Sequence, residues 1–262
     1  MATDLAIHIN ETPLVDTHEH LKKEHDWVEA GPDILQDLFG NYVPADLKTA
    51  GASTEALKNL MDGQNSDLIG RFEGIRSAWE ATQFTGYGEA VRLVASKCYG
   101  INELTGERLQ AGQEELGNLR KSGQRYDILK TKANLDHIQT DDFCWPCIPD
   151  ASGPDFFLYD LSWAEFCNGK IDVPGMLEET GIEVTDLSSL REGMTALFRK
   201  YASCAIAVKA QHAYNRTLNW EARSDRDASR ALTATLADDN KVSLADQLCL
   251  GDWCWARGVE LA

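Results

Sequence analysis

The sequence predicts an α/β protein, and three observations predict it. The segment PLVDTHEH at residues 13–20 has the alternating faces of a strand. A helix that begins at Asp186 and carries an apolar face leads through a short connection into the apolar strand 204–210, CAIAVKA. That order of elements indicates an α/β repeat. Between residues 66 and 132 apolar residues recur at helical spacing without a strand pattern, which predicts a helical insertion.

Local signals place the other helices and strands. Ser53 is a predicted N-cap, and Gly100 and Gly123 are predicted helix ends, because glycine readily adopts the left-handed conformation that closes a helix. Ser189 and Glu192 are predicted to form a capping box. The remaining elements are expected as helices at 33–39, 54–61, 225–237 and from 243 onward, and as strands at 135–140 and 156–161.

Composition narrows the class of protein. The 262 residues are 43% hydrophobic, which is enough for one sizeable core or two small ones, and the net charge is −17. Such a charge repels a phosphate backbone, so we expect no nucleic-acid partner. Neither a signal peptide nor the roughly 20 apolar residues of a membrane span is present in the pattern. The seven scattered cysteines fit a reducing compartment, so we expect a cytoplasmic protein that does not bind membranes.

The strongest chemical signal is the pair His18 and His20. On a strand, side chains at i and i+2 project from the same side, about 6.5 Å apart along the chain. Two neutral imidazoles in that arrangement can bind one divalent ion. The apolar residues that precede the pair place it at the carboxyl end of its strand, where active sites of (β/α) barrels form. The alternative is a surface or core role without metal.

A second signal is Lys209 in CAIAVKA. Alternation places Lys209 on the same face as Ala205 and Ala207, which is a costly location for a charged amine unless it is paired or used chemically. Beside a metal pair, Lys209 could bind the ion after carbamylation, or act unmodified as an acid or base. The alternative is a lysine beyond the strand end that reaches solvent.

The DTHEHL strand, the acidic helical segment rich in Trp and Tyr, and the Lys-bearing strand followed by HAYNRTL resemble the amidohydrolase-related superfamily, which includes relatives of uronate isomerase. The resemblance implies a single domain over residues 1–262, with a partial TIM-type (β/α) barrel of about the first four strands and the 66–132 insertion within it. It also implies a divalent metal, zinc first and manganese or another ion as alternatives. The family's His-x-His matches His18 and His20, and its fourth-strand lysine matches Lys209.

The sequence departs from this family after Lys209. The family requires a histidine on the fifth strand, often one on the sixth, and an aspartate on the eighth, whereas only His212 follows here. We therefore expect a chain truncated at its C-terminus and inactive by itself. An open sheet of this kind would associate through its edges as a homo-oligomer, aggregate or be poorly stable.

The expected function is metal-dependent hydrolysis of a small amide, lactone or ester by a metal-activated water. The alternatives are isomerisation of a sugar acid, as in uronate isomerase, and a non-catalytic α/β fragment. The loop after Lys209 is expected to meet the small-molecule substrate through His212, Tyr214 and Arg216, with the arginine suited to a carboxylate.

Two further motifs have simpler interpretations. Cys144 and Cys147 have the C-x-x-C spacing of redox and zinc sites, but the sequence context favours loop thiols. His137, inside the predicted strand 135–140, is expected to be a hydrogen-bonded structural residue.

Overall fold

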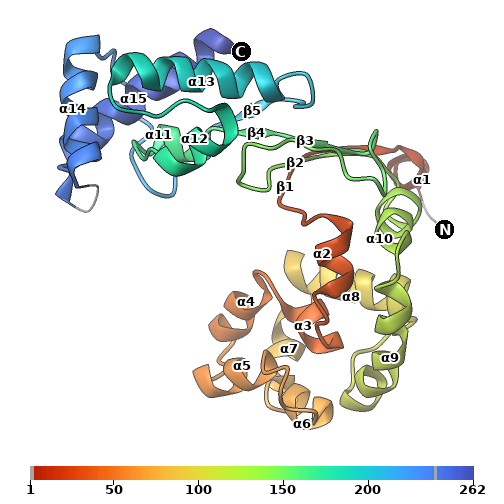
Figure 1. Cartoon of the computed structure of the whole chain (residues 1–262). Helices are drawn as coiled ribbons and strands as arrows, with labels where there is room; N and C mark the ends of the chain where they lie inside the picture. The colour runs from red at the N-terminus through yellow and green to blue at the C-terminus, as the bar shows by residue number, and fades with distance from the viewer. Residues whose placement is uncertain (1–2, 239–240) are drawn as a thin grey trace. The chain divides into compact units, whose positions relative to one another are not determined.

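The computed structural model describes residues 3–238 and 241–262, and the chain divides into two compact units. The helical unit consists of the segment that ends at Thr12 together with Lys22–Asn134. The barrel unit consists of Pro13–Leu21 and Leu135–Ala262. The chain therefore builds the first barrel strand, forms the helical unit and returns for the other strands (Figure 1). The sequence predicts that the inserted helical segment begins at residue 66, whereas in the structure it begins at Lys22.

Helices make up the helical unit. Its elements are α1 (Asp4–Glu11), α2 (Glu24–Glu29), α3 (Ile34–Phe39), α4 (Val43–Thr49), α5 (Thr54–Leu60), α6 (Leu68–Glu73), α7 (Arg76–Thr82), α8 (Gly86–Tyr99), α9 (Gly106–Leu119), α10 (Gln124–Asp127) and the π-helix η1 (Ile128–Lys132). The buried apolar faces of α3 to α9 form one core, to which Ile34, Leu35, Phe39, Leu47, Leu60 and Phe72 contribute fully buried side chains.

The ends of these helices test the local signals. Ser53 caps α5, because its hydroxyl accepts a hydrogen bond from the backbone of Ala56, and this confirms the prediction. Gly100 ends α8 in the left-handed conformation, with φ of 68°, as predicted. Gly123 does not end α9, which stops at Leu119; with φ of 84° it precedes α10 instead. The predicted helix end at Gly123 is therefore wrong.

Parallel strands form the barrel unit. They are β1 (Leu14–Glu19), β2 (Leu135–Thr140), β3 (Phe157–Tyr159), β4 (Leu161–Ser162) and β5 (Val208–Lys209). Within the described residues, β1, β2 and β3 pair in that order and β4 pairs with β5, every pairing being parallel. Since Asp160 alone separates β3 from β4, they act as one interrupted strand. The result is a curled half-barrel, which confirms the predicted α/β class and partial (β/α) barrel (Figure 1).

Helices follow the strands of the barrel unit: α11 (Ala164–Cys167), α12 (Val173–Thr180), α13 (Leu187–Tyr201), α14 (Asp225–Ala237) and α15 (Leu244–Leu261). The apolar face of α13 is buried as predicted, through Leu190, Met194 and Leu197. The capping box lies one turn earlier than predicted. Asp186 is the N-cap and exchanges hydrogen bonds with Ser189, so the predicted box with Glu192 is wrong.

The core of the barrel unit is aromatic where α15 meets α11. Trp163 is almost fully buried, and its indole N–H donates to the carbonyl oxygen of Cys254, 3.1 Å away. A Cβ at Gly258 would lie 2.5 Å from the indole nitrogen, so α15 approaches the ring closely only because it carries glycine there. In the described part of the chain, no helix has both the length and the apolar character that crossing a membrane requires.

Candidate functional site

The carboxyl ends of the parallel strands bring together charged and imidazole side chains. His18 and His20 lie at the end of β1, Asp141 directly follows β2, Asp160 follows β3, and Lys209 ends β5. The backbone N–H of Asp141 donates to the carbonyl of Glu19 at 2.9 Å, and that of Asp160 donates to the carbonyl of Thr140 at 2.9 Å. These ladder bonds hold the strand ends side by side. Active sites of (β/α) barrels form at this end of the strands.

The two histidines of β1 lie against each other. Their ring centroids are 5.2 Å apart with an interplanar angle of 89°, so both side chains leave the strand on the same side, as alternation predicts. Phe143 stacks on His20 with centroids 4.5 Å apart and ring planes within 8°. This contact restricts the orientation of the His20 ring.

A hydrogen bond determines which nitrogen of His20 is available. The Nδ1 atom lies 2.7 Å from the carbonyl oxygen of Asp141. Because a carbonyl only accepts hydrogen bonds, Nδ1 carries the proton and Nε2 retains a lone pair. Metal-binding histidines commonly have this arrangement, in which the second ring nitrogen donates to a backbone carbonyl or a carboxylate.

Two buried carboxylates lie beside the histidines. Asp141 is 0% exposed and Asp160 is 1% exposed. One oxygen of each is hydrogen-bonded: Asp141 Oδ1 accepts from the backbone of Phe143 at 2.9 Å, and Asp160 Oδ1 accepts from the side chain of Gln139 at 2.7 Å. The second oxygen of each is buried without a hydrogen-bond partner among the described residues. Buried acceptors without partners are rare in folded proteins and are found at sites that receive a ligand or water.

Lys209 completes this group. It ends β5, and its Nζ atom is buried with no hydrogen-bond partner in the residues that the structure describes, so it does not reach bulk solvent. Burial raises the pKa of Asp160, while the hydrogen bond from Gln139 and the charge of Lys209 oppose the shift. Asp160 therefore holds a proton more readily than an exposed aspartate does.

Asp141 and Asp160 were not among the residues that the sequence analysis selected. The signal that could have identified them is their position, because each directly follows the last residue of a strand that carries apolar side chains. The sequence predicts the first strand with its observed bounds, 135–140, but predicts the second as one strand over 156–161. A strand predicted to run through residue 161 hides the fact that Asp160 interrupts it.

The loop after β5 contains the three residues expected to bind substrate. His212 Nδ1 lies 3.1 Å from the carbonyl oxygen of Ala210. Tyr214 is 82% exposed. Arg216, expected to meet a substrate carboxylate, instead has a carboxylate of this chain in that position, because its guanidinium lies 2.5 Å from Asp252.

The weaker motifs have structural surroundings. His137 Nδ1 lies 2.8 Å from Asp136, which agrees with a hydrogen-bonded structural role. Cys144 and Cys147 are thiols that lie outside the helices and strands, in the segment between β2 and β3. The Cys144 thiol donates to Asp142 at 3.0 Å.

The side chains at the strand ends supply part of what a metal ion needs. His18 and His20 provide two nitrogen donors on the same side of β1, and the tautomer of His20 suits a ligand. In the described ranges, however, no group of three or more His, Cys, Asp or Glu side chains is close enough to hold one ion. The histidine pair therefore fits part of a metal site, since catalytic zinc usually has three protein ligands.

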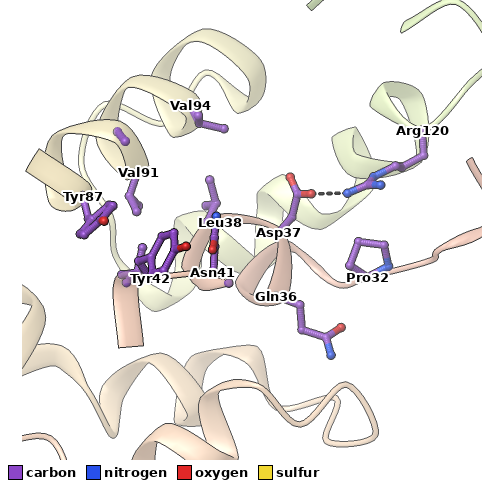
Figure 2. Close-up of a pocket in the computed structure, with 13 residues that line it drawn as sticks. Pro32, Gln36, Asp37, Leu38, Asn41, Tyr42, Tyr87, Val91, Val94 and Arg120 are labelled. Atoms are coloured by element: carbon purple, nitrogen blue, oxygen red, sulfur yellow. Dashed lines mark hydrogen bonds and ion pairs between the residues drawn. The ribbon is translucent and has the colours of Figure 1, made fainter. Parts of the chain in front are cut away.

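A cavity lies within the helical unit. A cavity of about 400 Å³ is bounded by the apolar side chains of α3 and α8 and by the stacked rings of Tyr42 and Tyr87 (Figure 2). Its charged residues, Asp37 and Arg120, form an ion pair, and the hydroxyl of Tyr99 also donates to Asp37. Because these charges are already paired, the strand ends of the barrel unit are the stronger candidate for chemistry.

Comparisons with known proteins identify a similar fold. No protein-family model and no curated protein matches the chain. Among solved structures, the chain is similar to uronate isomerase from Thermotoga maritima, with a TM-score of 0.71 and 14% sequence identity. The match covers 96% of this chain and 57% of that protein, so the chain spans little more than half of its length. At this identity the likeness establishes the fold alone.

Proposed function

We propose that the barrel unit carries part of a metal-dependent site of the amidohydrolase-related type, which acts on a small-molecule substrate. The observation that supports this best is the pair of exposed imidazoles at the end of β1, with the Nε2 lone pair of His20 available. His18 and His20 would hold a divalent ion, zinc first and manganese as the alternative. When bound, the ion would polarise a substrate carbonyl.

Among the reactions of such sites, isomerisation of a sugar acid is the one we favour. It moves a proton between neighbouring carbons, and Asp160 is a buried carboxylate with a raised pKa and one oxygen that no described residue hydrogen-bonds. The carboxylate would accept the proton from one carbon and, as the neutral acid, return it to the next. The similar fold of a uronate isomerase supports the same reaction.

Lys209 would serve this reaction by electrostatics. Its buried amine would donate hydrogen bonds to oxygen atoms of the substrate and would balance the negative charge that Asp141 and Asp160 bring to the site. Hydrolysis of a small amide, lactone or ester is the second candidate, because an ion held by the histidine pair would suit either reaction.

Metal binding tests the proposal directly. The purified chain is incubated with zinc or manganese, and bound metal is measured by mass spectrometry and titration calorimetry. We expect His18→Ala and His20→Ala each to weaken zinc binding by at least about tenfold, since each removes a ligand. His8→Ala, an exposed histidine of α1, is the matched control and should leave binding unchanged. Equal binding by all four proteins would refute ligation by the pair.

The reaction is tested with the zinc-loaded chain. Because the described residues supply two nitrogen donors and no cluster of three, we expect binding of ion and substrate without turnover. Calorimetry should show binding of a uronate in preference to an amide or lactone of the same size. Preferential binding of the amide or lactone would favour the hydrolase, and turnover would show that two donors suffice.

A further inference from the structure

We propose that Asp252 of α15 is a positioning residue: through Arg216 and Arg223 it anchors the loop after β5 and thereby presents His212 at the candidate site. This inference deepens the proposed function and rests on it in one respect, namely that the carboxyl end of β5 belongs to the site.

Asp252 is buried and accepts hydrogen bonds from several residues of the loop that follows β5. Its side chain is 1% exposed, and its two carboxylate oxygens are shared between two arginines. Oδ1 accepts from Arg216 at 2.5 Å, and Oδ2 accepts from Arg223 at 2.9 Å. The carbonyl oxygen of Asp252 also accepts from the indole of Trp220 at 3.0 Å. Three residues between β5 and α14 therefore depend on one residue of α15.

Arg216 is the deepest of these contacts. Its side chain is 6% exposed, and it also donates to the carbonyl oxygen of Cys167 at 3.1 Å. A Cβ at Gly251 would lie 2.7 Å from the guanidinium and 2.4 Å from the Cys167 carbonyl. The glycine beside Asp252 thus permits the close approach. A buried guanidinium needs such partners, because an uncompensated buried charge is costly.

The anchored arginine determines the position of His212. The backbone N–H of Arg216 donates to the carbonyl oxygen of His212 at 3.2 Å, and that of Asn215 donates to the same oxygen at 3.1 Å. This turn begins three residues after Lys209. His212 Nδ1 lies 3.1 Å from the carbonyl oxygen of Ala210, so Nδ1 carries the proton and Nε2 retains its lone pair, the same tautomer as in His20.

The surroundings of His212 lower the pKa of its imidazole. Burial lowers the pKa of the imidazole and the nearby Arg216 charge lowers it further, while the hydrogen bond to the Ala210 carbonyl and the Asp252 carboxylate raise it by smaller effects. A neutral imidazole with a free Nε2 can bind a metal or accept a proton. The ion pair between Asp252 and Arg216 therefore holds the His212 ring in position. The charge of Arg216 favours the neutral imidazole, which is the form that can bind a metal or accept a proton.

The experiment is a histidine NMR titration of the full chain without added metal. In the unchanged protein we expect the Nδ1–H tautomer for His212, a pKa below 6.5 and slow exchange of the loop amides. Asp252→Asn separates the two ways in which Asp252 could act. If Asp252 acts through its charge alone, its loss lowers the pKa further and preserves the tautomer. If Asp252 positions the loop, the pKa rises towards 6.5, the tautomer preference is lost and the loop amides exchange at least about tenfold faster.

Controls keep the outcome decisive. Glu260→Gln removes an exposed partner of Arg257 on the same helix and should leave His212 unchanged. Arg223→Gln is milder than Asp252→Asn because the Arg223 side chain is 24% exposed, and it should raise the pKa by a smaller amount. If Asp252→Asn fails to fold, the pKa and tautomer of His212 in Arg223→Gln and in the unchanged protein test the proposal instead. An ordinary pKa or the Nε2–H tautomer in the unchanged protein overturns the proposal, whether or not His18 and His20 bind metal.

Discussion

Replacing Arg71 with methionine should destabilise the helical unit strongly. Arg71 is 1% exposed on α6 and forms an ion pair with Asp33 at 2.6 Å. Its guanidinium also donates to the carbonyl oxygens of Asn59, Leu60 and Asn65, at 3.1, 2.8 and 2.8 Å. One side chain thereby joins the start of α3, the end of α5 and the connection to α6.

The expected loss follows from these contacts. Methionine retains most of the apolar stem of Arg71, so the loss is mainly polar. Each buried carbonyl left without a donor costs about 1–3 kcal/mol, with water able to recover part of it. Removing one partner of a buried ion pair typically costs about 3–5 kcal/mol. Because Asp33 keeps its hydrogen bond from the backbone of Gln36, we expect Arg71→Met to lower the free energy of unfolding by about 3–5 kcal/mol in total. The free energy of unfolding of an ordinary domain is about 5–15 kcal/mol, so this loss is a large part of the whole.

The measurement is native-state hydrogen exchange together with urea unfolding. Exchange distinguishes amides of the helical unit from those of the barrel unit, and we expect faster exchange in the helical unit. Arg76→Met is the matched control, because Arg76 forms an exposed ion pair with Glu73 one turn away and should have no measurable effect. A loss below about 1 kcal/mol for Arg71→Met, or an equal effect of the control, would refute the argument that Arg71 organises this unit.

Two further substitutions test other features. Gly258→Ala should lower the melting temperature and cost about 1–3 kcal/mol of unfolding free energy, because the new Cβ would lie 2.5 Å from the Trp163 indole. Gly117→Ala on α9 is the control: its Cβ would meet open space, so the melting temperature should rise. Glu179→Gln should weaken the pH dependence of stability in acid. The hydrogen bond from Lys200 lowers the pKa of Glu179, so its contribution is complete above pH 4.5 and is lost as the pH falls through the lowered value. Melting curves between pH 3 and 6 check this, and identical curves for both proteins would contradict it.

Structural features that depend on a few neighbouring residues are predicted correctly from the sequence. Alternation over residues 13–20 predicts that His18 and His20 lie on the same side, and the spacing of apolar residues in α13 predicts its buried face. The Ser53 cap and the Gly100 helix end are equally local. These succeed because strand and helix periodicity depend on backbone geometry alone. The errors at Gly123 and the α13 capping box concern where a helix starts or stops within one turn, which competing caps decide.

The remaining features depend on contacts between distant residues. Asp141 meets His20 across 121 positions, Gln139 bonds Asp160 across 21, and Arg216 meets Asp252 across 36. No pattern in the sequence states which strands pair or which face a helix covers. Sequence periodicity alone therefore determined the strand that carries the histidine pair and the α/β class. Only the tertiary structure decided which charges are buried together, because burial and parallel register arise when separate segments pack.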